Sequence, residues 1–295
     1  MNKLMSLHPI INTMRPTQWT KNLVLFAALV FDRQLLNIPA LVTTIAGFIL
    51  FCIISSLVYL INDIIDIQAD RQHPQKQHRP IAAGQLSIMS ALLFGIGLFC
   101  IAFPLAYYLS AAFALVGLLY FLSNLAYSRW LKHIPLIDVM FLAAAFIMRV
   151  LAGMTLIQVE RFSPWLFVIT SLLALFLGFG KRRAELALLA EDASIHRRVL
   201  DGYTLPFLDQ LITMISSTTV IAYSLYTFSA PNLPANHSMM LTIPFVLYGI
   251  LRYLYLIQME QCGGAPEIVL LKDRPMQITI ILWIATVIIV FYSGW

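Results

Sequence analysis

The sequence VYLINDIIDIQADRQHPQKQHRPIAAG covers residues 58–84 and continues an apolar run that begins near Pro39. Asp63, Asp66 and Asp70 stand at positions i, i+3 and i+7, so a helix would place them on one face, with Asn62 beside the first. Carboxylates this close repel one another, particularly beside a membrane of low dielectric constant. The stretch therefore predicts a hydrophobic helix with an acidic end that needs cations.

The composition is that of a membrane protein. Of the 295 residues, 60% are hydrophobic and only 11% are charged, far from the balance of a soluble domain. The net charge of +5 does not indicate nucleic-acid binding, because it follows the loops between apolar runs. We expect no cleavable signal peptide, since prolines and an arginine interrupt the N-terminal 19 residues. We interpret Cys52, Cys100 and Cys262 as small buried hydrophobes.

Hydrophobic runs predict an all-α polytopic membrane protein, a single transmembrane domain over residues 1–295. A spanning helix needs roughly 20 apolar residues. The predicted spans are roughly 19–35, 39–67, 86–108, 110–128, 135–157, 163–180, 207–229, 238–258 and 276–294, about nine transmembrane helices. The longest charged loops, 68–85 and 181–206, follow the second and sixth spans.

The charges are distributed unevenly between the two sides of the predicted bundle. Most of the 19 Lys and Arg residues fall on one side, which the positive-inside rule assigns to the cytoplasm. Most acidic residues map to the same side, which that rule does not predict. The pattern favours a bundle in a bacterial-type inner membrane with a polar cavity that faces the cytoplasm.

Asp63, Asp66 and Asp70 form an acidic stripe that suits Mg²⁺, which takes oxygen ligands from one or two carboxylates, water and substrate phosphates. Directly downstream, Arg71, Lys76 and Arg79, with His73 and His78, offer groups for phosphate oxygens. Two plainer interpretations remain open. The acidic residues can form a solvated helix end, and the basic ones can be ordinary positive-inside residues.

Further candidate binding residues lie elsewhere in the chain. The second charged loop opens with Lys181, Arg182 and Arg183, and Glu185 would join a metal shell or orient one of these cations; the alternative is a stop-transfer cluster. Arg149 lies inside a predicted span, as a functional residue or as a buried structural partner. The other candidates are Lys21 and Tyr127.

The motif NDxxDxxxD at 62–70, followed by RPxAxG at 79–84, resembles the UbiA superfamily of intramembrane prenyltransferases. That resemblance implies a nine-helix fold with a cytoplasm-facing polar cavity. The polyprenyl-phosphate phosphoribosyltransferase branch is most similar. The segments that carry this likeness are RPTQWTKN at 15–22, residues 62–84, YSRWLKHIPLIDV at 127–139, FIMRVLAG at 146–153, GKRRAEL at 180–186 and LLKDRP at 270–275.

The resemblance implies transfer of a 5-phosphoribosyl group from phosphoribosyl pyrophosphate to a polyprenyl phosphate. Asp63, Asp66 and Asp70 would bind Mg²⁺ and act in catalysis, and the other candidates would bind the substrates. Members that prenylate aromatic compounds usually carry a second aspartate-rich motif, where this chain has KRRAEL. An aromatic prenyltransferase and a transporter remain as alternatives, and a homo-oligomer is compatible with the fold.

Overall fold

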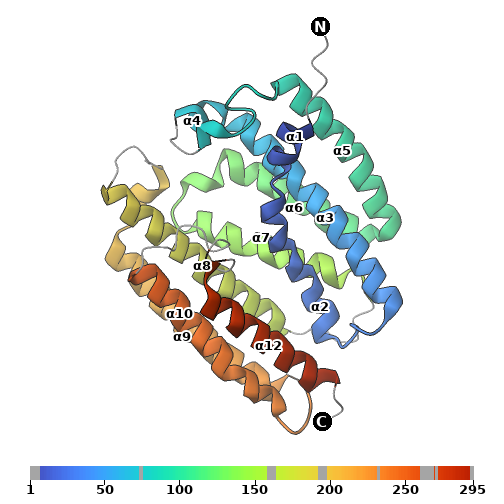
Figure 1. The fold of residues 1–295 in the computed structure, drawn as a ribbon, viewed down its shortest axis with the longest axis vertical. Helices are drawn as coiled ribbons and strands as arrows, with labels where there is room; N and C mark the ends of the chain where they lie inside the picture. The colour runs from blue at the N-terminus through green and yellow to red at the C-terminus, as the bar shows by residue number, and fades with distance from the viewer. Residues whose placement is uncertain are drawn as a thin grey trace. The chain divides into compact units, whose positions relative to one another are not determined.

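The computed structural model describes residues 7–72, 76–157, 164–191, 198–230, 233–259, 269 and 272–292. Every regular element in these ranges is a helix, which confirms the predicted fold class (Figure 1). The elements are α1 (Leu7–Met14), η1 (Pro16–Leu25), α2 (Phe26–Phe31), α3 (Ile38–Ile65), α4 (Ile67–Gln72), η2 (Lys76–His78), α5 (Ile88–Leu109), α6 (Ala111–Arg129), η3 (Leu131–His133), α7 (Ile137–Met154), α8 (Pro164–Glu191), η5 (Arg198–Gly202), α9 (Leu205–Ser229), η6 (Ser238–Thr242), α10 (Ile243–Gln258) and α12 (Arg274–Tyr292).

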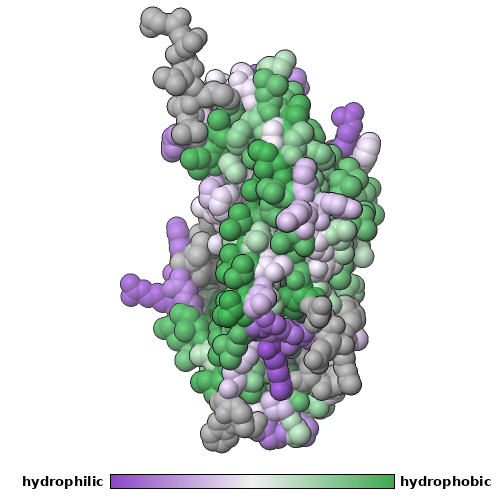
Figure 2. Space-filling model, turned by 90° about the vertical axis from the view of Figure 1, so that its right-hand side faces the viewer, coloured by the Kyte–Doolittle hydropathy of each residue, from purple (hydrophilic) through white to green (hydrophobic). Residues whose placement is uncertain are grey.

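Eight helical segments in the described part of the chain are long and apolar enough to cross a membrane. They correspond to eight of the predicted spans, and the chain is an integral membrane protein. Their outer faces carry large hydrophobic side chains, such as Leu93, Ile96 and Ile101 on α5, which are 57–63% exposed. Figure 2 shows one such face, on which hydrophobic residues predominate. Exposed apolar surface of this extent is what a lipid environment requires.

The first predicted span, residues 19–35, has a different structure. Residues Pro16–Leu25 form the 3₁₀ helix η1, and only Phe26–Phe31 form an α-helix. Arg15 precedes η1 in the left-handed backbone region, with φ of 51°. Half of the residues of η1 are polar, and the side chains of Trp19 and Asn22 bond to α3. This N-terminal segment is therefore held by polar contacts with α3.

The acidic helix also departs from the expected geometry. Helix α3 ends at Ile65, and Asp66 has φ of −92° and ψ of 8° before α4 begins at Ile67. The backbone stays bonded through the break, since Asp66 N donates to Asn62 O at 2.9 Å and Asp70 N donates to Asp66 O at 2.8 Å. The three aspartates therefore do not share one continuous helix face.

Helix α8 continues past the predicted end of its span. We predicted a loop from residue 181, but α8 extends to Glu191 and includes Lys181, Arg182, Arg183 and Glu185. The segment after Gly180 contains Ala, Leu, Lys, Arg and Glu, all strong helix formers, without Gly or Pro to end the helix. The charge cluster was wrongly assigned to a loop because charge marks the end of a span, not the end of a helix.

The chain divides into two compact units. The first is built from described residues within Met1–Leu29, Leu35–Ile134 and Met148–Gln158, and the second from those within Val30–Gln34, Pro135–Ile147 and Val159–Trp295. In the first unit, α3 packs against α5 and α6, and α1 and η1 pack against α3. In the second, α8 packs against α9, and α10 packs against α9 and α12. Each unit contains one of the two charged segments.

Close packing of η1 against α7 depends on Gly153. A Cβ at this position would lie 2.1 Å from the carbonyl oxygen of Leu25, a backbone atom that cannot move as a side chain does. We expect Gly153→Ala to reduce the free energy of unfolding by about 1–3 kcal/mol, measured by reversible unfolding in mixed micelles.

Gly97→Ala on α5 is the matched control, because no atom lies within 4 Å of the added Cβ. Alanine has the higher helix propensity, so this variant should be as stable as the parent or slightly more stable. Equal stability of the Gly153→Ala and Gly97→Ala proteins would contradict the packing argument.

Candidate functional site

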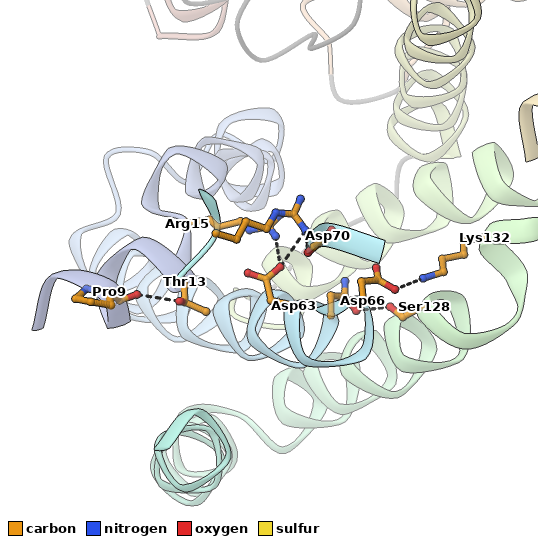
Figure 3. A network of polar contacts seen from close by, with 10 residues as sticks. Pro9, Thr13, Arg15, Asp63, Asp66, Asp70, Ser128 and Lys132 are labelled. Carbon is orange, nitrogen blue, oxygen red and sulfur yellow. Dashed lines mark hydrogen bonds and ion pairs between the residues drawn. The ribbon is translucent and has the colours of Figure 1, made fainter. Parts of the chain in front are cut away.

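Two aspartates and two arginines form a cluster in the first unit, the acidic cluster (Figure 3). It consists of Arg15, Asp63, Asp70 and Arg79. A single guanidinium nitrogen of Arg79 lies 3.2 Å from Asp63 Oδ1 and 2.6 Å from Asp70 Oδ2. Arg15 makes a second ion pair with Asp63 Oδ1. Asp63 and Asp70 are buried, and the arginines are 25% exposed, so the cluster is open on its cationic side.

Asp66 lies apart from this cluster. Its Oδ1 accepts a hydrogen bond from Lys132 Nζ at 2.6 Å (Figure 3). Asn62 accepts from the hydroxyl of Ser128 on α6. The structure therefore brings together two of the three predicted metal ligands. Among the described residues, no group of three or more His, Cys, Asp or Glu side chains is arranged to hold a metal ion.

The acidic cluster nevertheless fits a divalent cation. Asp63 Oδ2 is buried and has no hydrogen-bond partner among the described residues, although Oδ1 of the same carboxylate has two arginine partners. A buried carboxylate oxygen without a partner is costly. Mg²⁺ typically uses one or two carboxylates together with water and substrate phosphates. Asp63 and Asp70 provide such a pair.

The other predicted phosphate ligands near the acidic stripe differ in how exposed they are. Arg71 is exposed, and its Nε donates to the carbonyl of Ala82 at 3.2 Å. Lys76 is half-buried in η2, and His78 is exposed. His73 lies outside the described residues. Of the basic residues that the structure describes in this segment, Arg79 is the one with ion pairs to Asp63 and Asp70.

A second buried polar group of the first unit surrounds Arg149. This side chain is 4% exposed, and its Nε donates to Asn22 Oδ1 at 2.8 Å. Another guanidinium nitrogen donates to Tyr120 Oη at 2.7 Å. Its guanidinium carbon also lies 4.8 Å from the centre of the Tyr120 ring. Lys21, next to Asn22 on η1, and Tyr127, next to Ser128 on α6, are both half-buried.

In the second unit, Arg182 is at the centre of a buried network. Its Nε donates to Asp138 Oδ2 at 2.6 Å, and another guanidinium nitrogen donates to Glu185 Oε2 at 2.6 Å. Tyr203 donates to Asp138 Oδ1 at 2.8 Å and accepts from the backbone N–H of Leu136 at 2.6 Å. Burial raises the pKa of Tyr203, which keeps the phenol protonated as a donor. Arg182 and Asp138 are 1% and 0% exposed.

The two neighbours of Arg182 differ in their surroundings. Arg183 Nε donates to Asp209 at 2.6 Å, and another of its nitrogens donates to the carbonyl of Ile257 at 3.2 Å. Lys181 is half-buried. The three consecutive basic residues therefore have separate environments, and Arg182 is the buried one.

An ion pair at the start of α12 gives a pH-dependent prediction. Arg252 donates to Asp273 at 2.7 Å and 3.3 Å, and this hydrogen bonding lowers the pKa of Asp273. A carboxyl whose pKa is lowered by folding stabilises the protein above its unfolded pKa, about 4, and loses that contribution as the pH falls. We expect Asp273→Asn to reduce the melting temperature at pH 7, and the difference from the parent to shrink between about pH 5 and pH 3. A difference that is constant over this range would contradict the assignment.

Sequence reasoning did not include several residues of these networks among the site candidates: Arg15, Asn22, Lys132, Asp138 and Tyr203. Two signals were available. The segment RPTQWTKN is unusually polar for the start of a predicted span, and Asp138 is an acid near the start of the predicted span 135–157. An ionisable residue inside a membrane segment is a functional candidate by default.

Comparisons with known proteins agree with the fold and with the resemblance to the UbiA superfamily. The model of the UbiA prenyltransferase family matches residues 23–266. The chain is 34% identical to decaprenyl-phosphate phosphoribosyltransferase of Mycolicibacterium smegmatis, over 94% of this chain and 91% of that protein. It is 31% identical to the Corynebacterium glutamicum protein of the same name, over 96% and 86%. Its fold is similar to that of a UbiA homolog from Archaeoglobus fulgidus bound to GPP and Mg²⁺, with a TM-score of 0.73, 20% identity, and 96% and 99% of the two chains covered. The chain therefore belongs to the UbiA prenyltransferase family.

Proposed function

We propose that this membrane transferase moves a 5-phosphoribosyl group from phosphoribosyl pyrophosphate to a polyprenyl phosphate and releases pyrophosphate. The observation that carries this proposal is similarity to decaprenyl-phosphate phosphoribosyltransferases over nearly the whole of both chains. The family match includes residues of both compact units, so we treat the chain as one functional transmembrane domain. The cationic sequence KRRAEL at 181–186 also supports a donor with an additional phosphate.

The proposed transfer is a single substitution at the anomeric carbon of the ribose. An oxygen of the lipid phosphate forms a bond to the anomeric carbon of the ribose, and the bond from that carbon to the pyrophosphate oxygen breaks. The pyrophosphate leaves with the electron pair. The lipid phosphate is already an anion, so no strong general base is needed. Catalysis then depends on positioning and on stabilising the charge of the leaving group.

We assign the leaving group to the acidic cluster. Asp63 and Asp70 would hold Mg²⁺, which would supply positive charge for the departing pyrophosphate. Asp66, which pairs with Lys132, would contribute through water. Arg15 and Arg79 orient the two buried carboxylates, and their partly exposed guanidinium groups can meet phosphate oxygens as well. The Mg²⁺ bound to the Archaeoglobus fulgidus homolog supports a divalent cation.

The remaining candidates receive roles that match their accessibility. Asn62 and Tyr127 would bond to donor oxygens, and Lys21, Arg71 and Lys76 would bind phosphates. In the second unit, we propose Lys181 and Arg183 as phosphate ligands. Arg182 is buried between Asp138 and Glu185, so we propose that it orients Glu185. By the positive-inside rule, these groups face the cytoplasm at the inner membrane.

The proposal is tested with purified protein in lipid nanodiscs that contain decaprenyl phosphate. Phosphoribosyl pyrophosphate labelled in the ribose should transfer its label to the lipid, with one pyrophosphate released for each lipid modified. Removal of divalent cations with EDTA should stop the transfer, and added Mg²⁺ should restore it. Geranyl pyrophosphate with an aromatic acceptor is the parallel reaction. Prenylation there, with no labelled lipid, would establish the aromatic prenyltransferase alternative.

A further inference from the structure

Helix η1 is a 3₁₀ helix of ten residues, Pro16–Leu25. Runs of this conformation longer than three or four residues are uncommon, because their hydrogen-bond geometry is poorer than that of an α-helix. Tertiary contacts must therefore stabilise η1, and they are made with α3 and α7.

One set of contacts joins η1 to the polar face of α3. Asn22 is fully buried and donates to Ser55 Oγ at 3.1 Å and to Cys52 Sγ at 3.3 Å. One turn earlier in η1, Trp19 Nε1 donates to Ser56 Oγ at 3.1 Å. The earlier residue of η1, Trp19, thus bonds to the later residue of α3, Ser56. The two segments therefore run antiparallel.

The same register ends at the acidic cluster. Arg15 pairs with Asp63, and its guanidinium carbon lies 5.1 Å from the centre of the Tyr59 ring. Asn22 and Arg15 are seven residues apart, about 14 Å in a 3₁₀ helix. Ser55 and Asp63 are eight residues apart, about 12 Å in an α-helix. The two lengths match, so the contacts of Asn22 determine where Arg15 lies.

A second set of contacts fixes η1 on α7. Arg149 donates to Asn22 Oδ1 and to Tyr120 Oη. Gly153, one turn further along α7, allows the close approach of Leu25, which is three residues after Asn22. A single buried guanidinium thus links η1, α6 and α7, and through Asn22 it is linked to α3.

We propose that Asn22 and Arg149 are positioning residues of the transfer reaction, which set the register of η1 so that Arg15 reaches Asp63. The effect on activity rests on the proposed function. Arg149 then does not bind a substrate phosphate itself, because its buried guanidinium serves Asn22 and Tyr120. The alternative, which would overturn this proposal, is that Arg149 binds the lipid phosphate directly.

A matched pair of variants at Asn22 tests the kinetic part. Asn22→Asp loses the amide donor but keeps an acceptor oxygen both for Arg149 and for the Ser55 hydroxyl on α3, whereas Asn22→Leu has a similar volume and removes both contacts. We expect Asn22→Leu to lower kcat about 10- to 100-fold, as loss of an orienting partner does. Asn22→Asp should recover most of this activity.

A double-mutant cycle tests whether Asn22 and Arg149 affect activity through Arg15. If Asn22 and Arg149 act through Arg15, then Asn22→Leu or Arg149→Gln should add less than about twofold in an Arg15→Gln protein. Fully multiplicative losses would overturn the proposal. So would an increase in the KM for the lipid phosphate alone with Arg149→Gln, since that is the signature of a direct substrate contact.

A readout without substrate separates this proposal from the proposed function. Cys52 is 2% exposed and lies against Asn22, so its thiol reports whether η1 is docked. In a Cys100→Ser, Cys262→Ser background, Arg149→Gln should increase the rate of maleimide labelling at Cys52 about tenfold or more, since labelling then requires only local opening. Arg252→Gln, the same change at the arginine paired with Asp273, is the control and should leave the rate unchanged.

Equal labelling of the Arg149→Gln and parent proteins would overturn the positioning role, whatever the reaction catalysed. Faster labelling in a protein that does not transfer phosphoribosyl groups would contradict the proposed function alone.

Discussion

Asp63→Asn is expected to lower phosphoribosyl transfer by two to three orders of magnitude, on the order of the loss from removing one charge-stabilising group in an active site. The carboxylate is 1% exposed, pairs with Arg15 and Arg79, and has one buried oxygen without a hydrogen-bond partner in the part of the chain that the structure describes. Asparagine has nearly the same shape but removes the charge that attracts the cation. The measurement is the initial rate of labelled lipid formation at saturating donor.

The control for this variant is Asp201→Asn, the same chemical change at an exposed carboxylate in η5. Its rate should stay within about twofold of the parent, because exposed substitutions rarely have large effects. Membrane insertion and the monodisperse elution of both variants should be normal. Near-parental product formation by Asp63→Asn and Asp66→Asn proteins would refute the metal assignment.

The largest effect on stability is expected from Asp138→Leu. This change removes the fully buried partner of the Arg182 guanidinium, which keeps its ion pair with the less buried Glu185, and it removes the acceptor of the Tyr203 hydroxyl. Breaking a buried ion pair by removing one partner typically costs about 3–5 kcal/mol. We expect the free energy of unfolding to fall by about that amount, measured by reversible unfolding in SDS mixed micelles.

The double variant Asp138→Leu, Arg182→Met distinguishes loss of the buried Asp138–Arg182 ion pair from loss of packing. Replacing both members of a buried pair by apolar residues is often neutral, so the second change should restore most of the lost stability. If the double variant is less stable than Asp138→Leu alone, the loss came from packing. If Asp138→Leu is as stable as the parent, Arg182 is not dependent on this partner.

The sequence by itself determined the class of fold and the position of most elements. Runs of apolar residues long enough to cross a bilayer predicted the eight long helical segments, because backbone groups in lipid must be bonded within the segment. Local motifs also carried the resemblance to the UbiA superfamily, and the family match confirms that the chain belongs to this family. Pro164 begins α8 and Pro206 lies in the first turn of α9, positions that the fixed φ of the proline ring favours for a local reason.

Only the tertiary structure decided which charges meet. Asp63 is separated from Arg15 by 48 residues, Asp138 from Arg182 by 44, and Asp66 from Lys132 by 66. The 3₁₀ conformation of η1 likewise goes with its contacts to α3. Periodicity along the chain reports which residues share a face of one helix, but the pairing of side chains from different helices follows from how those helices pack.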